Sequence, residues 1–289
     1  MYTQYWKLQE RPFDDGDTSR YFCATEAVSA AVLKLRYAIE HRQHGLVLCG
    51  PSGVGKTTLL GHLRQTLASD TRLWIPILFP EMPVPELLAE IAERIAWASG
   101  MANSGDTVFS PTPEVRMSIR RIEQQLQENL HRGIQTVLVL EEAHRLSPPV
   151  LETLRLLLNF GDNEACHGLF LILSGQPGLL PMLNRLPHVE ERLSGRSLLP
   201  PFSMDETKQY VAHRLEIAGT RESPFDDEAL EVLHRVSGGI PRRINRIADM
   251  SLLLGFAEEV ERLNAELVQA VADDSTFSST ATPASTIPR

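Results

Sequence analysis

The chain has 289 residues, a formal net charge of -9 and three cysteines, and its sequence pI is near 5.5. A chain of this length can bury a sizeable core unaided, and its cysteines lie outside any CxxC pattern, so neither a disulfide framework nor a zinc site is expected. The negative charge gives the whole chain no attraction to a phosphate backbone, so nucleic-acid binding would require a local basic patch.

The N-terminal segment is rich in aromatic residues and lacks the apolar stretch of a secretory signal. Its aromatic side chains are those of Tyr2, Tyr5, Trp6, Phe13, Tyr21 and Phe22. Residues 25–41 then place apolar side chains at the spacing of an amphipathic helix. We expect residues 1–42, which comprise this segment and helix, to pack on the core that follows.

Apolar strands alternate with amphipathic helices through residues 43–200. The expected strands are residues 45–49, 73–78, 135–140 and 169–174, and the expected helices are residues 56–69, 86–99, 114–132 and 149–160. Residues 100–113 lack periodicity and are typical of a surface loop. The alternation predicts an α/β core in which a mostly parallel sheet is covered by helices on both faces.

Beyond residue 200 the pattern becomes purely helical, which predicts a small all-helical domain over residues 201–272. Its helices are expected at residues 205–218, 226–237, 241–257 and 264–272. Residues 273–289 are rich in Ser, Thr, Pro and Ala, so we expect a disordered tail. No apolar run approaches the roughly 20 residues that a membrane-spanning helix needs, so we expect no direct membrane insertion and a cytoplasmic location.

One glycine-rich motif lies between a predicted strand and a predicted helix. Its residues are Gly50, Pro51, Ser52, Gly53, Val54, Gly55, Lys56 and Thr57, which match the pattern GxxxxGK[ST]. In such a P-loop the backbone N–H groups surround phosphates, Lys56 reaches the β- and γ-phosphates, and Thr57 binds Mg²⁺. Thr58 could contact the α-phosphate. The motif predicts ATP and Mg²⁺ as cofactors, and a glycine-rich turn without nucleotide is the alternative.

Two carboxylates follow the apolar strand at residues 136–140. Glu141 would act on Mg²⁺ through its water shell, as a metal-binding residue, and Glu142 would polarise the water that attacks the γ-phosphorus. The usual first residue of such a pair is Asp. Because Mg²⁺ demands near-ideal octahedral geometry, the longer Glu141 is expected to slow hydrolysis more than it weakens binding. The alternative is that both residues merely end a strand.

Several further motifs combine with the P-loop and the Glu141–His144 sequence. They are residues 1–8, Arg11-Pro-Phe13, Ser19-Arg-Tyr-Phe22, Ser174-Gly-Gln-Pro177, Glu191-Arg-Leu193, residues 210–215, and Gly239-Ile-Pro-Arg242 with Asn245. Together, over roughly residues 1–270, they resemble the ExeA-like AAA+ ATPases, the general secretion pathway protein A group. The resemblance implies a P-loop NTPase core of the AAA+ type, followed by a helical lid domain.

By this resemblance, Ser174 and Gln176 are candidates for sensing the γ-phosphate, because they lie at the end of the apolar strand expected at residues 169–174. The sequence does not choose between them, and an ordinary transition from strand to loop is the alternative for each. Arg242 begins a helix of the lid domain, from which it could reach the nucleotide. A structural salt bridge is the alternative for Arg242.

Arg192 lies between the strand expected at residues 169–174 and the lid domain, where the resemblance implies an arginine that reaches the ATP of a neighbouring subunit. Arg196 is a second candidate for the same role. Surface arginines paired with Glu190 or Glu191 are the alternative for both. An arginine that acts in trans requires a homo-oligomer, which we therefore expect.

The resemblance implies an ATP-hydrolysing ATPase that couples nucleotide state to remodelling or recruitment of an unidentified protein partner, in secretion or cell-envelope processes. Full-length secretion members continue into membrane and peptidoglycan-binding regions, so we expect a short form. One alternative is a transposition- or initiator-type ATPase on DNA, a less favoured partner, with Arg242, Arg243 and Arg246 as its basic footprint. Another is a nucleotide-binding adaptor that does not hydrolyse ATP, as Glu141 suggests.

Overall fold

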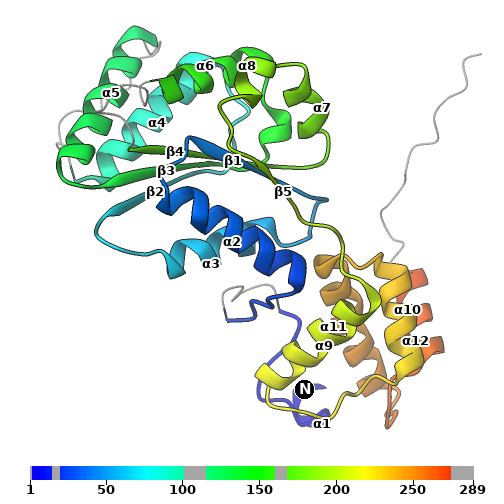
Figure 1. The fold of residues 1–289 in the computed structure, drawn as a ribbon. Coiled ribbons are helices and arrows are strands. Elements are labelled where there is room, and N and C mark those ends of the chain that lie inside the picture. The colour runs from blue at the N-terminus through cyan, green and yellow to red at the C-terminus, as the bar shows by residue number, and fades with distance from the viewer. Residues whose placement is uncertain (1, 15–19, 101–114, 160–167, 275–289) are drawn as a thin grey trace, which may run out of the picture. The chain divides into compact units, whose positions relative to one another are not determined.

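A computed structural model describes residues 2–14, 20–100, 115–159 and 168–274 and divides the chain into two units (Figure 1). The α/β unit is Ala24–Pro200, and the helical unit combines Met1–Cys23 with Pro201–Arg289. Residues 101–113 of the predicted loop and residues 275–289 of the predicted tail lie outside the described residues.

In the described part of the α/β unit, five parallel strands form one sheet in the order β2-β3-β4-β1-β5. The strands are β1 (Gly45–Cys49), β2 (Arg72–Ile77), β3 (Gln135–Leu140), β4 (Leu169–Gly175) and β5 (Arg196–Leu198). All residues of β1, β3 and β4 are buried, which explains why these strands are runs of apolar residues without alternation. The predicted parallel α/β fold is confirmed, and β5 is an addition that the sequence analysis missed.

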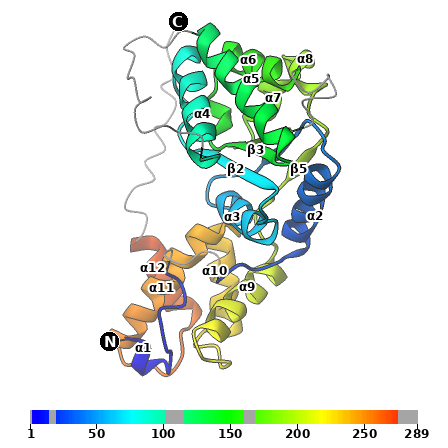
Figure 2. The same ribbon diagram turned by 90° about the vertical axis from the view of Figure 1, so that its left-hand side faces the viewer.

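Helices cover both faces of this sheet, α2 and α3 on one and α4, α5 and α6 on the other (Figures 1 and 2). The helices of the unit are α2 (Glu26–Glu40), α3 (Lys56–Thr66), α4 (Val84–Ala98), α5 (Val115–His131), the 3-10 helix η1 (Ala143–Arg145), α6 (Pro148–Asn159), α7 (Leu179–Asn184) and α8 (Pro187–Glu190). In α4, Leu88, Ile91 and Ile95 recur at helical spacing and are buried in the core. Burial of such faces holds the helices on the sheet.

The helical unit contains α1 (Tyr2–Tyr5), α9 (Met204–Ile217), α10 (Asp227–Ser237), α11 (Pro241–Ala257) and α12 (Ala265–Asp274). Local signals mark where these helices begin and end. Ser203 and Glu206 form a capping box at α9, and the Asp226 side chain accepts a hydrogen bond from the first turn of α10. Gly238 ends α10 with φ 62°, and Pro241 begins α11. No helix within the described ranges is long and apolar enough to cross a bilayer.

The N-terminal segment differs from the prediction, because Met1–Cys23 groups with the helical unit, whereas α2 groups with the α/β unit. Tyr2, Trp6 and Phe13 are buried in the same apolar core as α9 to α12. The Trp6 indole N–H donates to Leu252 O over 2.9 Å. The expectation that residues 1–42 pack on the core that follows them is therefore corrected for Tyr2, Trp6 and Phe13. Aromatic composition identifies a buried segment but does not identify what buries it.

Arg214 fastens the N-terminal segment to α9. Its guanidinium is buried, donates to Pro12 O and Asp14 O over 2.6 Å each, and lies 4.2 Å from the centre of the Tyr21 ring. Burial, with a contribution from Glu10, raises the pKa of Tyr21 to about 12, so the phenol under the cation stays neutral. Among the described residues, the cation is thus satisfied by carbonyl oxygens and an aromatic face.

Replacing Arg214 with Met should destabilise the helical unit by about 2–4 kcal/mol, because the Pro12 and Asp14 carbonyls lose a charged donor. Trp6 fluorescence during urea unfolding, with Trp74 and Trp97 replaced by Phe, would report this unit alone. The matched control is Arg221→Met, whose side chain is 90% exposed and which should change stability by less than about 0.5 kcal/mol. Equal effects of the two substitutions would contradict the role given to Arg214.

Candidate nucleotide-binding site

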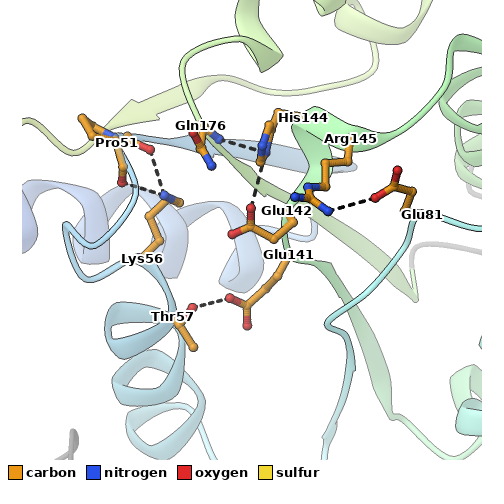
Figure 3. Close-up of polar contacts among 10 residues, drawn as sticks. Pro51, Lys56, Thr57, Glu81, Glu141, Glu142, His144, Arg145 and Gln176 are labelled. Carbon is orange, nitrogen blue, oxygen red and sulfur yellow. Dashed lines mark hydrogen bonds and ion pairs between the residues drawn. The ribbon is translucent and has the colours of Figure 1, made fainter. Parts of the chain in front are cut away.

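The glycine-rich motif forms the turn between β1 and α3 (Figure 3). Gly55 precedes α3 with φ 96°, and no side chain caps the helix there. The first N–H groups of a helix have no partner inside the helix. An uncapped helix start behind a glycine turn is therefore suited to an anion such as phosphate. This geometry is consistent with the prediction that the P-loop binds the phosphate groups of ATP.

Gly50 is required for a different reason. A Cβ atom at this position would lie 2.5 Å from Leu199 O and 3.0 Å from Val54 Cγ2, so a side chain cannot be accommodated without movement of the backbone. The Gly50 N–H donates to Gly175 O over 3.1 Å, which ties the start of the turn to the end of β4. Gly50 thus allows the turn to begin directly at the sheet.

Lys56 lies inside the turn with an exposed fraction of 8%. Its ammonium group donates to Gly50 O over 2.8 Å and to Pro51 O over 2.9 Å (Figure 3). A buried cation held by carbonyl oxygens is well placed to exchange them for phosphate oxygens. Burial raises the pKa of the neighbouring Cys49 thiol, against the opposing effect of Lys56, so this thiol stays protonated.

Thr57 and Glu141 come from α3 and from the end of β3, and the Thr57 hydroxyl donates to the Glu141 carboxylate (Figure 3). The longer side chain of Glu141 therefore reaches the predicted metal-binding hydroxyl. Among the described residues, no cluster of three or more His, Cys, Asp or Glu side chains could hold a metal ion. One hydroxyl and one carboxylate fit Mg²⁺, which usually binds few protein oxygens and completes its shell with water and phosphate.

Glu142 turns the chain out of the sheet. Its backbone adopts φ 52° and ψ 32° in the left-handed region, which is unfavourable for a residue with a side chain, and η1 begins directly after it. The Glu141 carboxylate lies beside Thr57, whereas the Glu142 carboxylate lies beside His144 (Figure 3). The left-handed turn therefore separates two adjacent carboxylates, as two different roles would require.

The two sensor candidates occupy different environments. Ser174 is buried at the end of β4, and within the described residues its Oγ atom has no hydrogen-bond partner. Gln176 is half-buried in the turn after β4, and its backbone N–H donates to His144 Nδ1 over 3.4 Å. No role was expected for His144, whose only sequence signal is its place in the Glu141–His144 motif.

The arginine candidates lie farther along the chain. Arg192 is half-buried between α8 and β5, and Arg196 donates to Asn184 Oδ1 over 2.6 Å and pairs with Glu190. Arg242 lies in the first turn of α11, in the helical unit, whereas the P-loop lies in the α/β unit. Thr58 is half-buried in the first turn of α3, next to Thr57.

Known proteins resemble this chain in sequence and in fold. A family described as AAA domain matches residues 39–183. General secretion pathway protein A of Aeromonas hydrophila is 33% identical over 288 residues, which cover 96% of this chain and 50% of that protein. An uncharacterized HTH-type transcriptional regulator of Methanocaldococcus jannaschii is 26% identical over 172 residues, which cover 58% of this chain and 41% of that protein. The chain spans about half the length of the curated relatives it matches.

Solved structures show the same fold at low sequence identity. Cdc6p from Pyrobaculum aerophilum has a TM-score of 0.71 at 16% identity, with 91% of this chain and 70% of that chain covered. The Aeropyrum pernix ORC2 protein has a TM-score of 0.67 at 16% identity, covering 92% and 72%. The RuvB Holliday junction branch migration motor of Thermotoga maritima has a TM-score of 0.57 at 20% identity, covering 88% and 70%.

The fold, the P-loop and the family match define the class of this protein, and the chain belongs to the AAA domain family of P-loop proteins. Within that class its sequence is ExeA-like, because it matches General secretion pathway protein A along nearly its whole length. The predicted resemblance to this group is confirmed.

Gly50→Ala should destabilise the α/β unit by about 1–3 kcal/mol, because the added methyl group would overlap Leu199 O. The matched control is Gly61→Ala in α3, where a Cβ meets no atom within 4 Å and stability should rise by about 0.5–1 kcal/mol. Denaturant unfolding followed by Trp74 fluorescence, with Trp6 and Trp97 replaced by Phe, measures both. A neutral Gly50→Ala variant would show that the turn has more room than the structure indicates.

Proposed function

We propose that the chain is an AAA+ ATPase that binds ATP with Mg²⁺ in the P-loop and hydrolyses it. The observation that carries this proposal is the contact between Thr57 and Glu141, which brings a hydroxyl of α3 to a carboxylate of β3 beside the buried ammonium of Lys56. A phosphate site and a magnesium site are the two elements that ATP hydrolysis requires. The P-loop fold of the family supports the same conclusion.

In this proposal Lys56 binds the β- and γ-phosphate oxygens, and Thr57 and Glu141 hold the metal. Bound Mg²⁺ supplies charge that neutralises the phosphate oxygens. Glu142, whose carboxylate is 44% exposed, accepts a hydrogen bond from the attacking water and orients it. Its separation from Glu141 supports this division of labour, because a carboxylate bound to the metal could not also orient water.

Two further roles complete the proposed site. Ser174 or Gln176 senses the γ-phosphate, and the buried Ser174 Oγ, which has no hydrogen-bond partner among the described residues, is a group that phosphate could satisfy. Arg242 contacts the nucleotide from the helical unit. Arg192 acts on the ATP of a neighbouring subunit in a homo-oligomer, and Arg196, which bonds to Asn184 and Glu190 of its own chain, is the alternative for this role.

Coupling of nucleotide state to the remodelling or recruitment of a protein partner is part of the same proposal. The name of the Aeromonas hydrophila relative points to a secretion pathway, although this chain covers 50% of that protein. We therefore propose a role in secretion or the cell envelope, with the ATPase acting in the cytoplasm, where ATP is available.

The purified protein should release phosphate from ATP in the presence of Mg²⁺, with a specific activity that rises with protein concentration if an arginine acts in trans.

Glu142→Gln should retain ATP binding and lower kcat by about 100-fold or more, because the water loses its base. Lys56→Ala should lose ATP binding, measured with a fluorescent ATP analogue. Glu141→Asp tests whether the longer side chain slows turnover, and should then raise kcat.

A wild-type chain that binds ATP but releases no more phosphate than Glu142→Gln would contradict hydrolysis. The chain would then act as a nucleotide-binding adaptor, and an active Glu141→Asp variant would identify the extra methylene as the cause.

A DNA-associated ATPase is the second candidate, favoured by a pocket of about 930 Å³ in the helical unit. Four arginines line this pocket, namely Arg11, Arg242, Arg243 and Arg246. Three carboxylates line the same pocket, those of Asp14, Asp249 and Asp274, and Arg11 pairs with Asp249 over 2.6 Å. These negative charges argue against DNA binding. Phosphate groups would be repelled by these carboxylates, so DNA remains the less favoured partner.

Filter binding of duplex DNA at two salt concentrations tests this candidate. If Arg243 and Arg246 contact phosphates, replacing either with Glu should weaken binding and reduce the slope of log K against log salt by about 0.9. Arg235→Glu is the matched control, because Arg235 is bonded to Gln269 and does not line the pocket. Absence of binding by the wild-type chain at low salt, with ATP present, would exclude the candidate.

A further inference from the structure

His144 lies in η1, between the Glu142 carboxylate and the turn that follows β4 (Figure 3). Its Nδ1 atom accepts a hydrogen bond of 3.4 Å from the Gln176 N–H and lies 3.7 Å from Glu142 Oε2. The His144 side chain is 19% exposed, compared with 44% for Glu142. One imidazole nitrogen is therefore in contact both with the proposed base and with the backbone of a sensor candidate.

The hydrogen bond from Gln176 decides how His144 acts on Glu142. An imidazole that accepts through Nδ1 carries its proton on Nε2. Nδ1 and Glu142 Oε2 are then both acceptors, so they do not bond to each other. His144 instead accepts the hydrogen bond of the Gln176 N–H, and its Nδ1 atom stands between that N–H and the Glu142 carboxylate. The Glu142 oxygens are thereby left to accept from water.

The backbone of His144 is held in place by packing. A Cβ atom at Gly175 would lie only 3.0 Å from the His144 N atom, so the end of β4 packs directly on η1. Ala143 is completely buried, and Arg145 pairs with Glu81 over 3.0 Å. The left-handed turn at Glu142 immediately precedes η1. Because η1 is fixed on both sides of His144, a shift of the turn after β4 would be passed to the imidazole.

We propose that His144 is a positioning residue for Glu142, which keeps the carboxylate free for the attacking water by engaging the Gln176 N–H. The inference rests on the proposed ATP hydrolysis. The same contacts connect the turn after β4 to Glu142. A movement of the Gln176 backbone on contact with the γ-phosphate alters the hydrogen bond to His144 and thus the surroundings of Glu142.

Three substitutions of His144 separate this role from simple packing. His144→Asn places its amide oxygen close to the position of Nδ1, whereas His144→Gln carries the same amide one methylene farther out, and His144→Ala has no acceptor. We expect kcat to fall by about 10-fold to 100-fold in the Ala and Gln variants, with KM and ATP affinity changed by less than about 3-fold. His144→Asn should retain kcat within about 3-fold of the wild type.

The wild-type chain and Glu142→Gln, assayed alongside, distinguish the possible failures. Wild-type activity that Glu142→Gln abolishes and that all three His144 variants retain would overturn the role of His144 alone. No hydrolysis by the wild-type chain would overturn the proposed function and this role together. If His144→Ala fails to fold, the two amide variants decide the question, and equal kcat values for Asn and Gln would contradict the positioning role.

Discussion

The parallel pairing of β1, β3 and β4 is the constraint on which the site depends. Leu48 is in register with Ser174, and Leu140 with Leu173, so these strands end at the same edge of the sheet. The P-loop, Glu141 and Gln176 each begin where one of these strands ends. Because both faces of the strands are buried, a slip of register would expose apolar side chains as well as separate the polar ones. The core and the site are therefore specified by the same pairing.

Backbone conformation then distributes the polar groups along that edge. Glu141 continues the direction of β3 and reaches Thr57, whereas the left-handed turn at Glu142 directs the chain into η1. Such a turn costs on the order of 1–3 kcal/mol for a residue with a side chain, and the packing of η1 against Gly175 offsets it. The unfavourable backbone at Glu142 is thus maintained where two neighbouring carboxylates need different surroundings.

The sequence predicted the fold class and the ends of the central strands well, because fully buried strands and the P-loop leave direct signals in composition and spacing. The three-residue strand β5 gave no such signal, since alternation cannot be recognised over so short a run. The partner of the aromatic segment and the contacts of His144 could not be predicted either. Both depend on residues distant in the sequence, as the 32 positions between His144 and Gln176 illustrate.

The helical unit is assembled from two stretches of chain that flank the α/β unit. Trp6 and its acceptor Leu252 are 246 positions apart, and Tyr5 and Val260 are 255 apart. During synthesis, the α/β unit is complete before α9 to α12 emerge, so it can fold while the aromatic segment still lacks its partners. The apolar side chains of that segment lack their native cover throughout this interval, and closure of the helical unit carries the loop entropy of the intervening chain. Chaperone demand and aggregation during biosynthesis should therefore be concentrated in the aromatic segment that precedes α2 rather than in the α/β unit.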